Sequence, residues 1–481
     1  MPAMGKLWEN IRRGREDRLL YLKGIVPYLF ALGCARAWVT LAVAAPVSAP
    51  AIPFDLHDAF DYAFCAASLA VALLVRRLLP LNGTPALRAA AGVAMVAASL
   101  CFVLAGLPDA PSAALVALGA ASGGVGFGLF LLLWAEVLSG LSLMRIFLYV
   151  TASQLMAVVF VFFCSGLDDL RMAVAMFCLP AAAVGCIGRA WRDIPAPERP
   201  PSSCPKFSYP WKIFALLALY SFAYGLRQPS LVEGAGMYSS ASTAIIMAVL
   251  FASAYFFPNR FNVGALYRSP LVLIVCGFLL VPAEGVLGAA ASSYLIAMSY
   301  SLVGIIVALL LYDIAKRAGV TVVVFAAIKG AEQVFVIAGK GAAGAMAEAG
   351  VAAGTQEAVI AVAVVAMMLA ATLILLSERE LASKWGVRIL DVGGLVEKTP
   401  EEERREARVA ELAERCRLTP RETEILQLIA QGKNGPAIRG ELFIAEGTFK
   451  AHTSHIYEKC GVPNRRGLVE LIAAGGSGGR R

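Results

Sequence analysis

Short polar and basic side chains on a helix predicted from Thr448 to Lys459 are the residues of this chain best suited to a chemical task. The ammonium group of Lys450 can donate to guanine O6 and N7 or to a phosphate, and the methyl group of Ala451 can pack on the methyl group of a thymine. These residues therefore indicate nucleic-acid recognition. The rival interpretation is a small helical bundle without affinity for DNA.

Four short helices predicted between Leu418 and Leu471 would hold those side chains in place. Pro420 begins the first helix, where its missing N–H costs nothing, and Thr419 is placed to cap it. Gly432 ends that helix. The elements that follow are a second helix from Pro436, a turn at Phe443-Ile444, the third helix closed by Gly461, and a fourth helix capped by Asn464. Two helices joined by a tight turn, the second bearing polar and basic groups, predict a helix-turn-helix.

The stretch resembles the LuxR-type DNA-binding domain, which also occurs in NarL/FixJ-type response regulators. In that family the third helix lies in the major groove, which implies that Lys450, Ala451 and Ser454 face base edges. It also implies that Thr448, at the helix N-terminus, meets a phosphate with the help of free N–H groups. The matching residues are Leu418-Thr419-Pro420-Arg421-Glu422, Gly432, Glu446-Gly447-Thr448-Phe449-Lys450, His452, Ile456-Tyr457, Lys459 and Gly461-Val462.

The resemblance implies partners as well as residues. It implies double-stranded DNA, bound by a homodimer at half-sites about one helical turn apart, with RNA polymerase as a further partner. The chain departs from the family at Asn434-Gly435-Pro436-Ala437, where a polar and a charged residue usually precede the second helix. We expect this departure to shift the start of that helix and to leave the fold intact.

The composition of the whole chain belongs to another class of protein. Of 481 residues, 59% are hydrophobic and only 16% are charged, and the mean hydropathy is +0.71. Soluble domains carry about 25% charged residues, so a membrane protein is expected, with the lipid bilayer as a partner. The ten cysteines show no CxxC or Cys/His spacing, which predicts reduced structural thiols and no zinc site.

Apolar runs of the length that a bilayer core requires recur at near-regular intervals after a basic N-terminus at 1–23. They predict twelve membrane spans within a domain at 24–376, followed by a linker and connecting helix at 377–417, the DNA-binding domain at 418–474 and a tail at 475–481. In the connecting helix, Val409, Leu412 and Ala413 form a thin apolar stripe. We interpret this helix as a solvated connector; the alternatives are packing of the stripe on the DNA-binding domain and pairing of two chains. The predicted spans are 24–45, 59–75, 89–107, 113–134, 146–166, 172–188, 213–232, 241–258, 270–288, 291–314, 319–339 and 358–376.

Basic residues gather in alternate loops and predict the orientation of the spans. The loops after spans two, four, six, eight and ten carry Arg76, Arg77, Arg88, Arg145, Arg189, Arg192, Arg199, Lys206, Lys212, Arg260, Arg268, Lys316 and Arg317. The other loops carry Asp55, Asp109, Asp168, Asp169, Glu233, Glu284 and Glu348, with only Arg171 and Lys340 among them. By the positive-inside rule both termini are expected in the cytoplasm and the spans in the cell membrane.

The proline-rich loop at 189–212 divides the spans into halves at 24–188 and 213–376, and two sequence echoes relate the halves. The segment Phe30-Ala31-Leu32-Gly33-Cys34-Ala35-Arg36 is echoed by Phe222-Ala223-Tyr224-Gly225-Leu226-Arg227. The stronger echo pairs Val125-Gly126, Leu131-Leu132-Leu133-Trp134 and Glu136 with Val303-Gly304 and Leu309-Leu310-Leu311-Tyr312-Asp313. Six-plus-six parallel repeats resemble the major facilitator fold. The usual glycine-and-basic signature after the second span is replaced by Leu78-Leu79-Pro80-Leu81-Asn82-Gly83, which argues against transport.

Ionisable residues inside the spans are candidates for a ligand site, because a charge at the centre of a membrane helix is costly and therefore faces the bundle interior. Arg36 and Arg227 occupy matching places in the halves and would suit an anionic or carboxylate-bearing small molecule. The further candidates are Glu136, Lys329 and Glu332, of which the last two are spaced to pair. The alternatives are structural pairing of the arginines with Glu136, Asp313 or Glu332, and snorkelling of the arginines to the outer surface.

Together these features predict an all-α, polytopic membrane protein with a C-terminal helix-turn-helix. No catalytic constellation, phosphate-binding loop or metal motif stands out, so we expect neither an enzyme nor a cofactor. The resemblance implies a one-component transcription regulator whose membrane half senses a small molecule and whose tethered domain binds DNA. Two alternatives stay open: a major-facilitator-like transporter with a regulatory DNA-binding tail, and a scaffold that tethers DNA without sensing.

Overall fold

The fold was analysed in a computed structural model of the chain, which falls into two compact units, residues 1–395 and 396–481. The basic segment at 1–23, the turn at Phe443-Ile444, the tail at 475–481 and most of the predicted linker lie outside the described residues. The structure describes residues 30–44, 55–107, 110–141, 143–194, 199, 210–233, 237–256, 263–281, 289–318, 320–330, 332–350, 353–375, 408–409, 411–430, 432–442 and 445–473.

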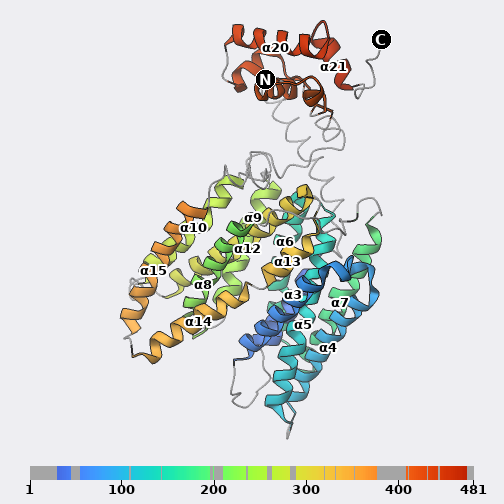
Figure 1. Cartoon of the computed structure of the whole chain (residues 1–481). Helices are drawn as coiled ribbons and strands as arrows, with labels where there is room; N and C mark the ends of the chain where they lie inside the picture. Colours follow the sequence, from blue (N-terminus) through green and yellow to red (C-terminus); the bar gives the residue numbers. More distant parts are fainter. Residues whose placement is uncertain are drawn as a thin grey trace, which may run out of the picture. The chain divides into compact units, whose positions relative to one another are not determined.

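Helices make up the first unit, and no strand occurs in the ranges just given (Figure 1). This confirms the predicted all-α fold class. Its helices are α2 (Ala31–Ala44), α3 (Leu56–Leu78), α4 (Pro85–Ala105), α5 (Ser112–Ser139), α6 (Leu143–Cys164), α7 (Asp169–Asp193), α8 (Trp211–Glu233), α9 (Met237–Phe256), α10 (Val263–Leu280), α12 (Ala289–Ala318), α13 (Val322–Gly330), α14 (Gln333–Glu348) and α15 (Ala353–Leu375), with a short 3-10 helix η2 (Leu81–Gly83).

The outer surface of this unit is apolar. Within the described residues, seven segments are long and apolar enough to cross a membrane, and four shorter apolar helices lie in further predicted spans. Large hydrophobic side chains point away from the core, with Leu73 85% exposed and Phe162 74% exposed. In water such exposure would be unfavourable, whereas against lipid tails it costs nothing. The unit is therefore that of a multi-pass membrane protein.

The helix contacts of the first unit repeat along the chain. In the first six helices α2 packs on α6 and α7, α4 packs on α5 and α7, and α3 packs on α5. The later helices pack in the same order, with α8 on α14 and α15, α10 on α12 and α15, and α9 on α12. The two sets meet where α6 contacts α9 and where α3 contacts α13.

Glycines explain how the helices of the first sequence echo approach their neighbours. A Cβ on Gly225 of α8 would lie 2.1 Å from the carbonyl oxygen of Val336 on α14, and a Cβ on Gly339 would lie 2.3 Å from that of Phe222. The matching Gly33 of α2 faces α6 in the same way, 2.9 Å from the carbonyl oxygen of Ser153. Small residues are needed wherever helix backbones touch within a membrane.

The eleventh predicted span, 319–339, differs from the structure in two respects. It consists of two helices, because α13 ends at Gly330 and α14 begins at Gln333. In addition, α14 continues beyond residue 339 to Glu348, through Lys340, which the sequence placed near the end of a span. The helix can continue because two carboxylates compensate the Lys340 charge, with Asp58 Oδ1 at 2.5 Å and Asp55 Oδ2 at 3.8 Å from its Nζ.

Among the described residues, the second unit contains α18 (Pro420–Ala430), α19 (Gly435–Leu442), α20 (Glu446–Cys460) and α21 (Arg465–Ala473), preceded by helical residues at 408–409 and 411–415. Its core joins residues from each of α18 to α21, namely Ile425, Leu426, Leu428, Ile429, Ile438, Ile456, Leu468 and Ile472. Val409 and Leu412 belong to the same core, at 1% and 4% exposure. The interpretation of their stripe as a solvated connector was therefore wrong, because these side chains are needed to cover α18–α21.

Left-handed residues end three helical segments of this unit. Gly432 and Gly461 have φ of 82° and 66°, and each is followed by the paired backbone hydrogen bonds of a Schellman cap. Arg417 has a φ of 49° and is followed by the same pair of backbone hydrogen bonds, although it carries a Cβ. The predicted ends of the first and third helices at the two glycines are thus confirmed.

Candidate functional site: a nucleic-acid interface and a buried polar cluster

Helix α20 presents one exposed and one buried face. Thr448, Lys450, Ala451 and Ser454 are all exposed, whereas Thr453 and Ile456 on the opposite face are buried. The helix begins at Glu446, two residues earlier than predicted, because the N–H of Phe449 bonds to the carbonyl of Ala445. The four residues assigned to DNA contact therefore share the accessible face.

The start of α20 combines an N-cap residue that makes no side-chain hydrogen bond with a group of exposed charges. Its N-cap, Ala445, has no side-chain oxygen, so no side chain of that residue caps the first N–H groups. Lys450 pairs with Glu446 at 2.9 Å, and Glu446 also pairs with Arg439 at 3.1 Å. These contacts hold the pKa of Glu446 below its usual value, chiefly through the Lys450 hydrogen bond. Because the pairs are exposed, a phosphate can replace Glu446 at little cost.

Glu422 holds α20 against α18. Its Oε2 accepts from the N–H of Thr419 at 2.8 Å, while the N–H of Glu422 donates to Thr419 Oγ1 at 3.3 Å, which makes a capping box. The same carboxylate pairs with Lys459 Nζ of α20 at 2.7 Å and is 4% exposed. Sequence reasoning found the cap and matched Lys459 to the family motif, but it did not find this ion pair.

The departure at Asn434-Gly435-Pro436-Ala437 has a packing explanation. Helix α19 begins at Gly435, one residue before Pro436. A Cβ at Gly435 would lie 3.2 Å from Cε1 of Phe449, so the ring of Phe449 lies directly against this glycine. The shift in the helix start was expected, and the four-helix fold is retained.

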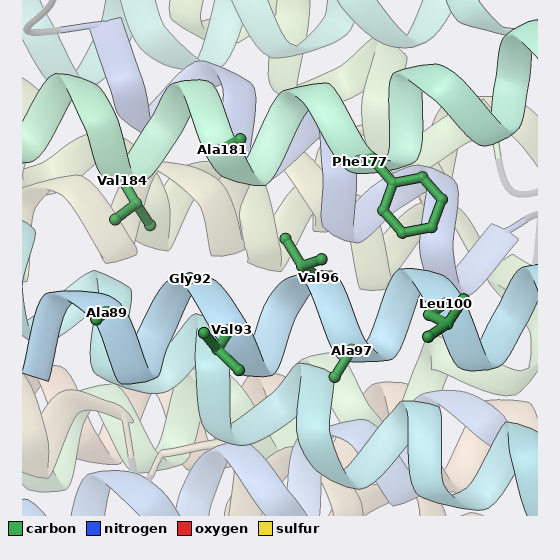
Figure 2. A pocket seen from close by; sticks show the side chains of 9 residues that line it. All are labelled: Ala89, Gly92, Val93, Val96, Ala97, Leu100, Phe177, Ala181 and Val184. Carbon is green, nitrogen blue, oxygen red and sulfur yellow. The ribbon is translucent and has the colours of Figure 1, made fainter. Parts of the chain in front are cut away.

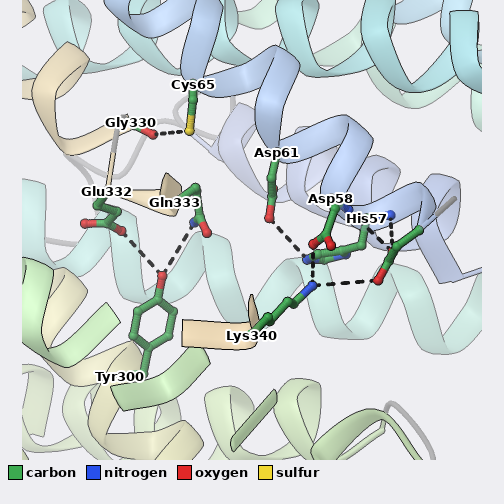
Figure 3. Close-up of polar contacts among 10 residues, drawn as sticks. His57, Asp58, Asp61, Cys65, Tyr300, Gly330, Glu332, Gln333 and Lys340 are labelled. Carbon is green, nitrogen blue, oxygen red and sulfur yellow. Dashed lines mark hydrogen bonds and ion pairs between the residues drawn. The ribbon is translucent and has the colours of Figure 1, made fainter. Parts of the chain in front are cut away.

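The membrane unit brings two of its five candidate ligand residues into contact and a third into their neighbourhood. Glu332 accepts from Lys329 Nζ at 3.2 Å. It also lies 3.5 Å from Tyr300 Oη, which Gln333 Nε2 approaches at 3.5 Å (Figure 3). We call Lys329, Tyr300, Glu332 and Gln333 the break cluster, because they gather at the α13–α14 break, and Arg36 of α2 lies within electrostatic range of Tyr300 and Glu332.

The other two candidates lie in different surroundings. Glu136 of α5 is 2% exposed and binds the loop between α3 and α4, accepting from the N–H groups of Leu81 at 3.0 Å and Asn82 at 2.7 Å. This structural contact holds the loop after the second span, in which other residues replace the glycine-and-basic signature of the major facilitator fold. Arg227 of α8 is 5% exposed and lies one helical turn after Tyr224, whose ring stacks on Tyr300 with centroids 4.3 Å apart.

A second set of charges joins α3 and α14 (Figure 3). Lys340 Nζ lies 2.5 Å from Asp58 Oδ1, and His57 Nε2 lies 3.6 Å from Asp61 Oδ2. Because α3 and α14 come from opposite halves of the predicted repeat, this pair ties the halves together. The sequence placed Asp55 and Lys340 in or near outer loops and did not pair them, although their charged atoms lie 3.8 Å apart.

A groove of about 530 Å³ between α4 and α7 has a different character (Figure 2). Its lining is entirely apolar, and its lining residues Val93 and Leu100 are 68% and 47% exposed. A groove without a polar group does not suit an anionic ligand. Its lining residues are Ala89, Gly92, Val93, Val96, Ala97, Leu100, Phe177, Ala181 and Val184.

Comparison of the membrane unit with solved structures finds a sugar transporter. A crystal structure of the major facilitator superfamily transporter FucP, in the outward conformation, covers 73% of this chain and 98% of that chain with a TM-score of 0.45 and 11% sequence identity.

Comparison of the C-terminal unit finds bacterial regulators. The family described as bacterial regulatory proteins, luxR family, matches residues 417–472. A probable transcriptional regulatory protein NarL of Mycobacterium tuberculosis is 46% identical over 52 residues, which are 11% of this chain and 24% of the relative. The chain thus spans about a quarter of the NarL protein that it matches.

A shorter relative is matched along most of its length. The spore germination protein GerE of Bacillus subtilis is 42% identical over 59 residues, which are 12% of this chain and 80% of that protein. The matched residues are those of α18 to α21, including the capping box and the exposed face of α20. Through this domain the chain belongs to the luxR family of bacterial regulatory proteins.

Proposed function

We propose that the protein is a membrane-embedded one-component transcription regulator, with both termini in the cytoplasm, that senses a small molecule and binds DNA through α20. The observation that carries this proposal is the exposed face of α20 on a luxR-family domain, in a chain whose remaining helices can cross a membrane. A DNA-binding domain has access to DNA only on the cytoplasmic side, which agrees with the basic residues of the loops.

On DNA, α20 lies in the major groove. Lys450 exchanges Glu446 for guanine O6 and N7 or for a phosphate, and Ala451 and Ser454 face base edges. Thr448 and the free N–H groups at the start of α20 hold a phosphate. The protein binds as a homodimer to two half-sites and acts on RNA polymerase from there.

Sensing works by a shift between two arrangements of the membrane helices. A ligand that contacts both halves stabilises one arrangement, and it shifts the equilibrium only by its differential affinity for the two. The chosen arrangement changes how often two DNA-binding domains meet.

The decisive experiment is cross-linking of cells that make the full-length protein, followed by recovery from membranes and sequencing of the attached DNA. We expect discrete sites that disappear in Lys450→Ala and persist in Arg466→Ala, which removes an equally exposed charge from α21. Equal occupancy in wild type and Lys450→Ala would overturn the assignment of α20 to the groove.

A transporter with a regulatory tail is the second candidate, and the repeated helix contacts of the membrane unit favour it. Accumulation of a labelled compound by sealed vesicles that contain the protein would support it. A pure sensor binds the compound only in proportion to the amount of protein present and accumulates none inside the vesicles.

A further inference from the structure

The hydrogen-bond pattern changes where α13 gives way to α14, inside a membrane-spanning segment. Helix α13 ends at Gly330, Glu332 is the N-cap of α14, and the N–H of Glu332 bonds to the carbonyl of Lys329 at 3.1 Å, three residues back instead of four. Broken helices within a membrane often carry ligand sites.

The carboxylate at this break is incompletely bonded. Glu332 is 7% exposed, and its Oε1 is occupied by Lys329 and Tyr300. Its Oε2 is buried and receives no hydrogen bond from any residue in the described ranges. A buried carboxylate oxygen without a donor is costly, so the break cluster lacks one hydrogen-bond donor.

Arg36 supplies a positive charge near Glu332, and its side chain is exposed. Its neighbours Ala35, Ala37 and Trp38 are buried, and its electrostatic partners are Tyr300 and Glu332. The exposed guanidinium group of Arg36 is therefore within electrostatic range of the break cluster. A guanidinium group binds a carboxylate through two parallel hydrogen bonds.

The charges of the cluster define the missing partner. Lys329 Nζ pairs with Glu332 Oε1 at 3.2 Å, whereas no carboxylate of the described residues lies at ion-pair distance from Arg36. The stacked rings of Tyr224 and Tyr300 add an apolar wall. The partner must therefore bring one carboxylate for Arg36 and one hydrogen-bond donor for Glu332 Oε2.

We propose that the break cluster and Arg36 together bind a small carboxylic acid that also carries a hydroxyl or amino group. Arg36 holds the carboxylate, and Glu332 Oε2 accepts from the hydroxyl or amino group. This ligand class rests on the sensing role proposed above, and it explains how a ligand acts on the bundle. Arg36 lies on α2 and Glu332 on α14, so the bound acid joins helices from the two halves and favours the arrangement in which they are close.

The test uses full-length protein in lipid nanodiscs and six probes in two matched series. The first series is propionate, lactate and alanine, and the second is 3-phenylpropionate, 3-phenyllactate and phenylalanine. In at least one series, the hydroxy or amino acid is expected to bind at least about tenfold more tightly than the unsubstituted parent, as measured by calorimetry, because a site that accepts from O–H or N–H rejects the analogue that lacks it.

Two substitutions separate the two contacts. Arg36→Gln is expected to lose binding of every probe in the series. Glu332→Gln is expected to keep the affinity for the parent acid and to reduce the advantage of the hydroxy or amino acid to less than about twofold. The matched controls are Arg76→Gln at the exposed end of α3 and Glu348→Gln at the exposed end of α14, and both should bind as wild type does.

Three results would overturn the proposal: equal binding of parent and substituted acids, an advantage that survives Glu332→Gln, or no binding of any of the six probes to wild type. The DNA sequencing experiment is independent of these probes. Probe binding without DNA sites would support the ligand site and overturn the role as a regulator. DNA sites without probe binding would support the role as a regulator and overturn the ligand site.

Discussion

The two units of this chain use the same secondary structure and are held together by different forces. In the membrane unit, helices touch through glycines such as Gly225 and Gly339, where backbone meets backbone. In the C-terminal unit, a cluster of aliphatic side chains is removed from water, and an ion pair between the buried carboxylate of Glu422 and the exposed Lys459 fixes α18 to α20. Lipid tails are as apolar as leucine, so burial of apolar area drives folding in water and contributes little between helices in a bilayer.

The role of glycine contacts in holding the membrane unit together is tested most severely where α8 crosses α14. Gly339→Leu adds a side chain where a single Cβ already meets backbone at 2.3 Å, so the helices must separate, at a cost of more than about 3 kcal/mol. We expect little folded protein in membranes, as measured by the yield of monodisperse protein in detergent. Gly341→Leu on the same helix has open space at its Cβ and should give wild-type yield. Equal yields for the two variants would show that the backbone contact is not required.

The second prediction concerns the ion pair of the C-terminal unit. Glu422→Ala removes the capping box and leaves Lys459 without its carboxylate, for an expected loss of about 3 kcal/mol, whereas Glu422→Gln retains an acceptor for the cap and loses about 1–2 kcal/mol. Hydrogen exchange of the α18 and α20 amides in the full-length protein measures both. Glu424→Ala, at an exposed position of α18, is the control and should change exchange little. A wild-type exchange pattern in Glu422→Ala would contradict the role of the pair.

Charges also join helices in the membrane unit, at Lys340 and Asp58, and there we expect a smaller effect. Lys340→Gln removes an ion pair whose carboxylate is 27% exposed and should cost about 1–2 kcal/mol of thermal stability in nanodiscs. The exchanged pair Asp58→Lys with Lys340→Asp should recover part of the loss that either single reversal causes. Arg171→Gln, at a fully surface-exposed pair, provides the reference for a neutral change. Additive losses in the exchanged pair would exclude a direct interaction.

Acid should weaken the C-terminal unit through the same Glu422. Burial raises the pKa of this carboxyl, but hydrogen bonds from Lys459 and Thr419 outweigh the burial and hold the pKa below 4.5. Because the folded-state pKa is lowered, the stabilisation is complete above the unfolded-state value and is lost as the pH falls through the folded-state value. Hydrogen exchange of α20, corrected for the intrinsic pH dependence, should therefore show falling stability below about pH 4.5 in wild type and a flatter profile in Glu422→Gln. Parallel profiles would assign the acid sensitivity to other carboxylates.

The smallest expected effect tests a helix end. Arg417 adopts a left-handed conformation in which glycine is favoured, so Arg417→Gly should stabilise the C-terminal unit by about 0.5–1 kcal/mol. Gly461→Ala places a Cβ in the same conformation and should destabilise by about 1 kcal/mol, although its surroundings are open. Both changes are measured by hydrogen exchange across α20. The same sign for both variants would rule out backbone conformation as the cause.

The described helices lie where local patterns placed them, with exceptions that share a physical cause. The cap at Thr419, the ends at Gly432 and Gly461 and the apolar helices between are local properties, since each depends on residues within a few positions. The continuation of α14 through Lys340 could not be predicted, because the carboxylate that compensates this charge lies 282 residues away in the chain. The burial of Val409 likewise depends on α18 and α21, which pack on it only in the folded unit.

The candidate site residues also divide into those that local patterns could predict and those whose contacts depend on tertiary packing. Helical periodicity and a short motif are enough to place Thr448, Lys450, Ala451 and Ser454 on α20 of a luxR-family domain, so these residues could be predicted. The contact of Glu136 with the α3–α4 loop and the approach of Arg36 to Glu332 depend on the folded bundle and could not. A helix pattern states which residues share a face, but which faces meet depends on how all the helices pack, and that packing brings charges from distant parts of the chain together.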